Sequence, residues 1–182
     1  MKIRRIAFIG VFAALTAVLA QISFPIPFTN VPFTLAIAGV MLTGAILPPV
    51  DAFFALLAYL LVGLAGVPVY SQFTAGPGIL FGITGGYIFG YAVMAPIIAF
   101  AAKRFQKHLY PALIVGMIVG LAACYIIGTA WYMLLTGADL VVALSGCVIP
   151  FIIPDLIKAV LMASLAIALR KALSKANLYT FA

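Results

Sequence analysis

The chain has 182 residues, of which 67% are hydrophobic and only 7% charged, and its mean hydropathy is +1.33. Soluble domains are about half apolar and about a quarter charged, so this composition excludes a protein that covers its surface with polar groups and predicts one surrounded by lipid. The net charge of +7 would suit nucleic acid, but the basic residues form short clusters at the ends of apolar runs. Such clusters are typical of membrane orientation signals, so we expect a membrane protein that does not bind nucleic acid.

The N-terminal stretch, residues 1–22, combines a basic start with a long apolar run. It is similar to a secretory signal peptide, but the run is long and further spans follow, so we interpret it as a first transmembrane helix. Within it, Ala13 and Ala17 are four residues apart, with Gly10 and Ala14 beside them. Small residues at this spacing let helices approach closely, which predicts either packing within the bundle or a docking surface for another membrane protein.

Six apolar segments follow one another along the chain, and each is expected to form a helix. The second and third are short for a bilayer crossing, which takes about 20 residues, and Pro48-Pro49 breaks the chain between them; we count both as spans. The predicted fold class is an all-α integral membrane protein with six transmembrane helices in a single domain, residues 1–182. The segments are Ile6–Ile22, Phe33–Leu47, Ala52–Gly66, Leu80–Ala102, Leu113–Leu135 and Val148–Leu169.

The distribution of Lys and Arg tests this count, because the cytoplasmic flanks of spanning helices are enriched in both. Nine of the ten basic residues lie at the N-terminus, in the connection after the fourth segment or in the C-terminal tail, and the three connections on the opposite side contain none. This pattern predicts that both termini are cytoplasmic. The tenth basic residue is Lys158, within the last segment. The nine are Lys2, Arg4, Arg5, Lys103, Arg104, Lys107, Arg170, Lys171 and Lys175.

Two connections on the outer side are predicted to be structured. Residues 23–34 contain three prolines, which forbid a continuous helix, and they are apolar enough to form a lid over a pocket at membrane level. Residues 67–90 are rich in glycine, which allows the backbone to approach a ligand closely. Non-helical backbone at membrane depth is tolerated only where protein buries it or it lines a cavity. The alternative for this second segment is a turn followed by a glycine-lined helix contact.

The residue patterns of catalysis, nucleotide binding and metal binding are missing from the sequence. Residues 82–86, Gly-Ile-Thr-Gly-Gly, lack the Lys-Ser/Thr of a phosphate-binding loop. His108 is the only histidine, and no Ser/His/Asp or Cys/His set can be assembled at one membrane depth. Cys124 and Cys147 lie in or beside apolar stretches without a CxxC motif, which predicts two small buried residues rather than a disulfide or a metal site. We therefore expect a protein that is not an enzyme and binds no metal.

The last apolar segment carries two opposite charges, Asp155 and Lys158. Their i,i+3 spacing places both side chains on one face of a helix. A charge within a spanning helix costs a few kcal/mol or more, so it usually pairs, faces a cavity and marks the path of a ligand or ion. In the six-span topology the pair lies toward the outer face, in a site reached from outside the cell. The alternative is that the two charges only neutralise each other, which would stabilise the protein little.

Together these features resemble the BioY family, the biotin-binding S components of energy-coupling-factor (ECF) vitamin transporters. Val31-Pro32-Phe33-Thr34 is similar to the family's VP-x-T form, and Gly82-Ile83-Thr84-Gly85-Gly86-Tyr87 is similar to its LGPTGGY form. Pro154-Asp155-Leu156-Ile157-Lys158 is similar to its PGD-x-IK form, with Pro154 where the family often has Gly. With six spans of this length, the resemblance covers nearly the whole chain.

The resemblance implies a protein of the prokaryotic plasma membrane that captures biotin from outside. It would work with a transmembrane coupling subunit and two cytosolic ATPases, so ATP would be hydrolysed by the partners and this chain would carry no cofactor. Small residues of the first helix would contact the coupling subunit, a role that fits Ala13 and Ala17. The residues assigned to ligand binding are Asp155, Lys158, Tyr87, Thr84, Gly85, Gly86, Thr74 and Thr34.

The chemistry of these side chains suits biotin. Its ureido ring offers N–H donors and a carbonyl acceptor, which match an ionised Asp and a Lys. Its thioether ring and aliphatic chain suit an apolar pocket, which we expect to be built in part by Phe24, Phe28, Phe33, Tyr70 and Tyr87. Where members of the family carry Gln, Asn and Arg, this chain has Ala36, Thr74 and Ile88, so Lys158 is the only basic residue expected at this depth.

Two other functions are compatible with the sequence. An autonomous secondary transporter, proton-coupled or facilitative, of biotin or another small vitamin would use Asp155 as a proton relay. An integral membrane enzyme is disfavoured, because the sequence offers no catalytic set.

Overall fold

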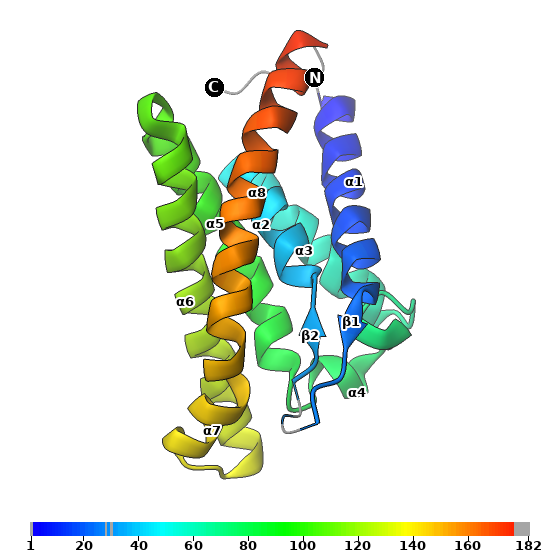
Figure 1. Ribbon diagram of the computed structural model, residues 1–182. Coiled ribbons are helices and arrows are strands. Elements are labelled where there is room, and N and C mark those ends of the chain that lie inside the picture. The colour runs from blue at the N-terminus through cyan, green and yellow to red at the C-terminus, as the bar shows by residue number, and fades with distance from the viewer. Residues whose placement is uncertain (1, 28, 30, 177–182) are drawn as a thin grey trace.

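Helices make up most of the structure, a computed structural model that describes residues 2–27, 29 and 31–176 (Figure 1). Each of the six apolar segments forms a helix, and the connections add shorter elements. The long helices are α1 (Lys2–Gln21), α2 (Ala36–Ile46), α3 (Pro49–Leu64), α5 (Gly85–Arg104), α6 (Leu109–Thr136) and α8 (Ile149–Lys175). The shorter elements are β1 (Ser23–Phe24), β2 (Phe33–Thr34), the 3-10 turns η1 (Ser71–Phe73) and η2 (Gln106–His108), α4 (Pro77–Leu80) and α7 (Leu140–Cys147).

In the described part of the chain, four helices are long and apolar enough to cross a membrane: α1, α5, α6 and α8. The helices α2 and α3, with 11 and 16 residues, are shorter than the roughly 20 residues that a crossing takes. A strand precedes α2, and Pro48, which has extended backbone, separates it from α3. The structure therefore confirms a mostly helical protein with four helices able to cross a membrane, whereas six crossings and cytoplasmic termini stay predictions.

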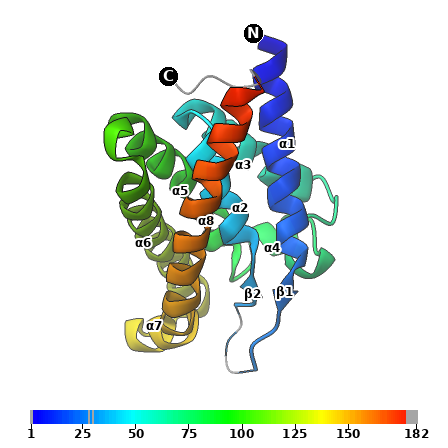
Figure 2. The ribbon, with the colours of Figure 1, turned by 45° about the horizontal axis from the view of Figure 1, so that its top comes forward.

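The helix α2 lies at the centre of the bundle and packs against α1, α3, α5 and α8 (Figure 2). All its residues except Ile37 are buried, as expected for a helix that is apolar on every side. Close packing against α1 depends on Gly39, where a Cβ would lie 2.9 Å from Cα of Thr16. Because protein surrounds α2, it can be much shorter than a lipid-facing span.

The described residues of the segment 23–34 form a hairpin in which Ser23 pairs with Thr34 and Phe24 with Phe33. The prediction that this segment is not helical is confirmed, and Figures 1 and 2 place it at the same end of the molecule as α4 and α7. Phe28, one of the aromatic residues expected near the pocket, lies outside the described residues.

The connection from α3 to α5 is held against the base of this hairpin. Gln72 and Phe73 adopt positive φ angles of 60° and 55°, an uncommon and strained conformation for residues other than glycine. Two hydrogen bonds support it: the Gln72 N–H donates to Oγ of Ser23 at 3.1 Å, and the Phe73 N–H donates to Oε1 of Gln21 at 2.9 Å. The strained turn is thereby fixed beside the hairpin.

The basic clusters lie at the opposite end, where α1 begins and α8 ends (Figure 1). One acid is also there: Asp51, in the first turn of α3, accepts from Nε of Arg5 at 3.0 Å and from Nη2 at 2.5 Å. A carboxylate in the first turn of a helix is also favoured by the helix dipole. This ion pair ties α1 to α3.

Candidate ligand-binding site

Asp155 and Lys158 form a buried ion pair on α8. Nζ of Lys158 lies 2.7 Å from Oδ1 of Asp155, and the two residues are 6% and 0% exposed, respectively. The same ammonium donates to the backbone oxygen of Thr34 at 2.8 Å and lies 4.0 Å from the ring centroid of Phe33, within reach of a cation–π interaction. Lys158 therefore connects α8 to the second strand of the hairpin.

A third side chain completes this group. The hydroxyl of Tyr125, on α6, donates to Oδ2 of Asp155 at 2.7 Å, so both carboxylate oxygens accept a hydrogen bond. We call Asp155, Lys158 and Tyr125 the charged triad. Tyr125 was not among the residues predicted from sequence. A tyrosine hydroxyl within an apolar run needs a hydrogen-bond partner, and this requirement could have indicated that Tyr125 pairs with a buried polar group.

The charged triad lines a small inner cavity of about 30 Å³, little more than the space one water molecule needs. Six elements meet there: the hairpin, α2, α5, α6, α7 and α8. The lining residues are Val31, Pro32, Thr34, Ile37, Tyr87, Tyr91, Tyr125, Cys147, Phe151, Asp155 and Lys158. The ion pair thus faces a cavity rather than being sealed inside continuous packing.

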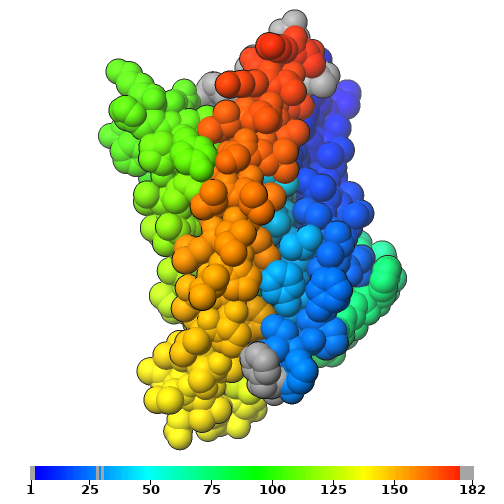
Figure 3. Space-filling view, viewed as in Figure 1, coloured from blue at the N-terminus to red at the C-terminus, as the bar shows by residue number. Residues whose placement is uncertain are grey.

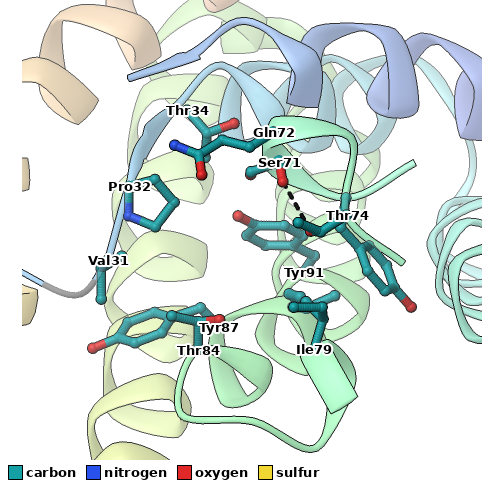
Figure 4. A pocket seen from close by; sticks show the side chains of 12 residues that line it. Val31, Pro32, Thr34, Ser71, Gln72, Thr74, Ile79, Thr84, Tyr87 and Tyr91 are labelled. Carbon is teal, nitrogen blue, oxygen red and sulfur yellow. Dashed lines mark hydrogen bonds between the residues drawn. The ribbon is translucent and has the colours of Figure 1, made fainter. Parts of the chain in front are cut away.

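A larger outer cavity of about 180 Å³ adjoins the inner one (Figure 4). Val31, Pro32, Thr34, Tyr87 and Tyr91 line both, so the two cavities are adjacent compartments of one site. The outer cavity adds neutral polar side chains and two aliphatic ones: Ser71, Gln72, Thr74, Thr84, Ile79 and Ile88, together with Tyr70. Figure 4 shows the side chain of Gln72 reaching across from its turn toward Pro32 and Thr34.

Six of the eight predicted ligand-binding residues lie at these cavities. Asp155 and Lys158 line the inner one, Thr74 and Thr84 line the outer one, and Thr34 and Tyr87 line both. The hydroxyl of Thr74 donates to the backbone oxygen of Ser71 at 2.8 Å, which stabilises the strained turn.

Gly85 and Gly86 are not among the lining residues. A Cβ at Gly85 would overlap the backbone oxygen of Leu80, and one at Gly86 would overlap Cβ of Trp131. Their missing side chains therefore serve the close packing of α5 against α4 and α6. The structure supports the alternative stated for this segment, a turn followed by a glycine-lined helix contact.

The aromatic residues of the site are partly those expected. Tyr70 and Tyr87 line it, whereas Phe24 is 61% exposed and lies away from the cavities. Tyr91, Tyr125 and Phe151 are additional lining residues. Tyr91 could have been selected, because it follows Tyr87 by one helical turn and shares its face.

The site has one cation and one anion, which neutralise each other. Among the Lys and Arg side chains that the structure describes, only that of Lys158 lines either cavity. Ile88 also lines the outer cavity. The resemblance described above implies that some members of the family have Arg at this position. Burial raises the pKa of the Cys147 thiol, so this lining residue is neutral at physiological pH.

Among the residues that the structure describes, no group of three His, Cys, Asp or Glu side chains could hold a metal ion. The arrangement is instead that of a binding site: one charged triad for a polar group, aromatic walls for an apolar body, and hydroxyl and amide groups at the outer cavity. Such a combination suits a small ligand with a hydrogen-bonding head.

Ala13 and Ala17, assigned to a partner interface, are half-buried and pack against the core of this chain. Their neighbours Gly10 and Ala14 are exposed, and a Cβ at Gly10 would meet no atom within 4 Å. Ala13 and Ala17 therefore take part in packing within this chain, and their contact with a partner stays a prediction; the exposed small residues beside them on α1 are Gly10 and Ala14.

Comparisons with known proteins agree on one family. The model of the BioY family matches residues 1–175. "Biotin transporter BioY2" of Lactococcus lactis subsp. cremoris is 36% identical over 178 residues, covering 98% of this chain and 96% of that protein. "Biotin transporter BioY" of Thermotoga maritima is 35% identical over 162 residues, covering 89% and 93%. The fold is similar to a crystal structure of the S-component for biotin from an ECF-type ABC transporter, with a TM-score of 0.86, 24% identity, and coverage of 93% of this chain and 92% of that one.

Proposed function

Because the chain belongs to the BioY family, we propose that it is the membrane subunit that captures biotin from outside the cell for uptake by an ECF transporter. The family is one of transporter components and not of enzymes. The single observation that carries the proposal is the charged triad, because two opposite charges and a tyrosine hydroxyl meet at a cavity buried among apolar helices.

The two charged residues of the triad can form hydrogen bonds with the ureido ring of biotin. An ammonium has three N–H donors, and those of Lys158 reach two acceptors in the described structure, Asp155 and the Thr34 carbonyl. The third can donate to the ureido carbonyl, while Asp155 accepts from a ureido N–H. Charge-assisted bonds of this kind are about twice as strong as neutral ones.

The hairpin of residues 23–34 acts in this proposal as the lid of the site. A bicyclic ring is larger than an inner cavity of about 30 Å³, so part of the wall must yield on binding. Val31 and Pro32 belong to the hairpin and line both cavities, and the bond from Lys158 to Thr34 holds the hairpin closed. We expect the bond between Lys158 and Thr34 to open while biotin enters, so that Val31 and Pro32 move aside, and to form again once biotin is bound.

The valeryl tail of biotin would extend into the outer cavity. Among the residues that the structure describes, no Lys or Arg lines that cavity, so the biotin carboxylate would be held by the neutral groups of Ser71, Gln72 and Thr74, or by water. In the proposed transporter, ATP would be hydrolysed by partners, because this sequence has no phosphate-binding loop. These partners would be a transmembrane coupling subunit and two cytosolic ATPases.

Binding of radiolabelled biotin to the purified, detergent-solubilised chain tests the proposal. We expect tight binding without ATP, and no displacement by an excess of thiamine or riboflavin. A folded protein that fails to bind biotin would overturn the assignment. Uptake by cells lacking any coupling subunit, abolished when the proton gradient is dissipated, would instead support autonomous secondary transport.

Tyr125→Phe should weaken biotin binding by about tenfold, because a hydrogen bond to a charged group contributes about 1.5–3 kcal/mol and its loss leaves Asp155 less well oriented. The matched control is Tyr110→Phe, which removes a hydroxyl from the same helix at a position that is 42% exposed. Equilibrium binding measurements compare the biotin affinities of the two variants. Unchanged affinity in Tyr125→Phe would exclude Tyr125 from the site.

A further inference from the structure

A third cavity lies at the basic end of the molecule, between the start of α6 and the end of α8, which stand apart at the top of Figure 3. It measures about 430 Å³ and is lined by Gln106, Leu109, Arg170, Lys171, Ser174 and Lys175. We propose that this groove, which we call the basic groove, binds the phosphodiester headgroup of an anionic membrane lipid.

The charge of the basic groove favours an anion. Three of its six lining side chains are cationic and none is acidic. The three aspartates of the sequence lie elsewhere: Asp51 pairs with Arg5, Asp155 pairs with Lys158, and Asp139 precedes α7 at the other end. Lys171 and Lys175 are one helical turn apart, and like charges at this spacing repel each other, so a phosphate between them would stabilise the last turns of α8.

Arg170 is held in place at the wall of the basic groove. It is half-buried, and its Nε donates to the backbone oxygen of Ala45, in the last turn of α2, at 2.7 Å. This bond satisfies one of the carbonyl groups that every helix leaves without an internal partner at its C-terminus. A guanidinium oriented in this way suits phosphate oxygens, and the amide of Gln106 and the hydroxyl of Ser174 add neutral donors.

The depth of the basic groove points to a lipid as the source of the phosphate. The helices α6 and α8 have 28 and 27 residues, or lengths of about 40 Å at 1.5 Å per residue, whereas the hydrocarbon core is about 30 Å thick. The last turns of α8 therefore extend into the headgroup layer. Farther from this end of the molecule both helices expose aliphatic side chains, such as Val119 and Leu165, against which acyl chains can lie. Basic pockets between membrane helices bind anionic headgroups in this way.

Thermal unfolding of the purified full chain in detergent, with increasing phosphatidylglycerol, tests this proposal. We expect phosphatidylglycerol to raise Tm in a saturable manner, and phosphatidylcholine or inorganic phosphate at the same concentration to have no effect. The double substitution Lys171→Gln/Lys175→Gln should reduce the apparent affinity for phosphatidylglycerol by tenfold or more, since each basic residue near an anionic membrane surface contributes about a fivefold factor. Lys175→Gln alone should produce a smaller loss in the same direction.

The matched control is Lys103→Gln/Lys107→Gln, which removes two charges at the same end of the molecule but outside the basic groove. This control should keep the full response to phosphatidylglycerol. An equal loss in both double variants would show that the response comes from general surface charge and would overturn the proposal. Equal stabilisation by inorganic phosphate would identify a site for soluble anions and would overturn the assignment to lipid.

Discussion

Replacing Lys158 by alanine should reduce biotin affinity by about 100-fold in a protein that still folds. Truncating one partner of a buried, hydrogen-bonded charge pair in a binding site typically costs about 2–5 kcal/mol of binding free energy, and each 1.4 kcal/mol is a factor of ten in an equilibrium constant. The substitution removes the donor that we assign to the ureido carbonyl and leaves Asp155 buried without its counter-ion.

Folding should suffer less than binding. Tyr125 still donates a hydrogen bond to the Asp155 carboxylate in this variant, which offsets part of the penalty for the lost counter-ion. The hairpin also loses its bond to α8, because Lys158 donates to the carbonyl of Thr34, so the lid closes less firmly over any ligand.

Equilibrium binding and thermal unfolding of the same preparations separate these effects. Lys158→Met keeps most of the aliphatic stem of the lysine. It should lose as much biotin affinity as Lys158→Ala, because the ammonium group and not the packing of the stem binds the ligand. Lys103→Ala, at an exposed position of α5, is the control and should bind normally. A Lys158→Ala protein that unfolds at the same temperature and binds biotin normally would contradict the assignment of the site.

The parts of the site that sequence predicted are those with a local signal. Asp155 and Lys158 stand out because charges are rare in apolar runs, and their i,i+3 spacing brings them together on one helix. The hairpin was predicted to be non-helical because its prolines cannot continue a helix. The six helices follow from hydropathy, which is a property of each segment by itself.

The parts that sequence missed depend on contacts between distant segments. Tyr125 is 30 residues from Asp155 and meets it only because α6 packs beside α8. The eight-residue helix α7 lies between two predicted spans and is too short to give a clear periodic signal. The central position of α2, enclosed by four helices, explains why it is shorter than a span, and no local pattern distinguishes a short buried helix from a short membrane-facing one.

Replacing Gly86 by alanine should lower the stability of the protein by about 2 kcal/mol or more, since forcing an extra methyl group into a well-packed interface typically costs 1–3 kcal/mol. The new Cβ would overlap Cβ of Trp131 and would lie 3.2 Å from Cα of Gly128. Neither atom is the free end of a flexible side chain, so α5 and α6 would have to separate.

Separation of these helices would also disturb the binding site. A Cβ at Gly128 would overlap the ring of Tyr87, which shows how closely that ring lies against α6, and the Tyr87 hydroxyl shares a 3.2 Å hydrogen bond with Thr129. The indole of Trp131 donates to the backbone oxygen of Gly82 at 3.0 Å, so a shift of α6 would pull on the turn before α5. We therefore expect weaker biotin binding as a consequence of lost packing.

Gly10→Ala is the matched control, because it adds the same methyl group to a helix where no atom lies within 4 Å of it. Alanine favours helix more than glycine by about 0.8–1 kcal/mol, so this variant should be slightly more stable, the opposite sign to Gly86→Ala. Thermal unfolding with and without saturating biotin decides the role of Gly86. A packing role requires a lower Tm without ligand, whereas a direct ligand contact would leave that Tm unchanged and reduce only the increase that biotin produces.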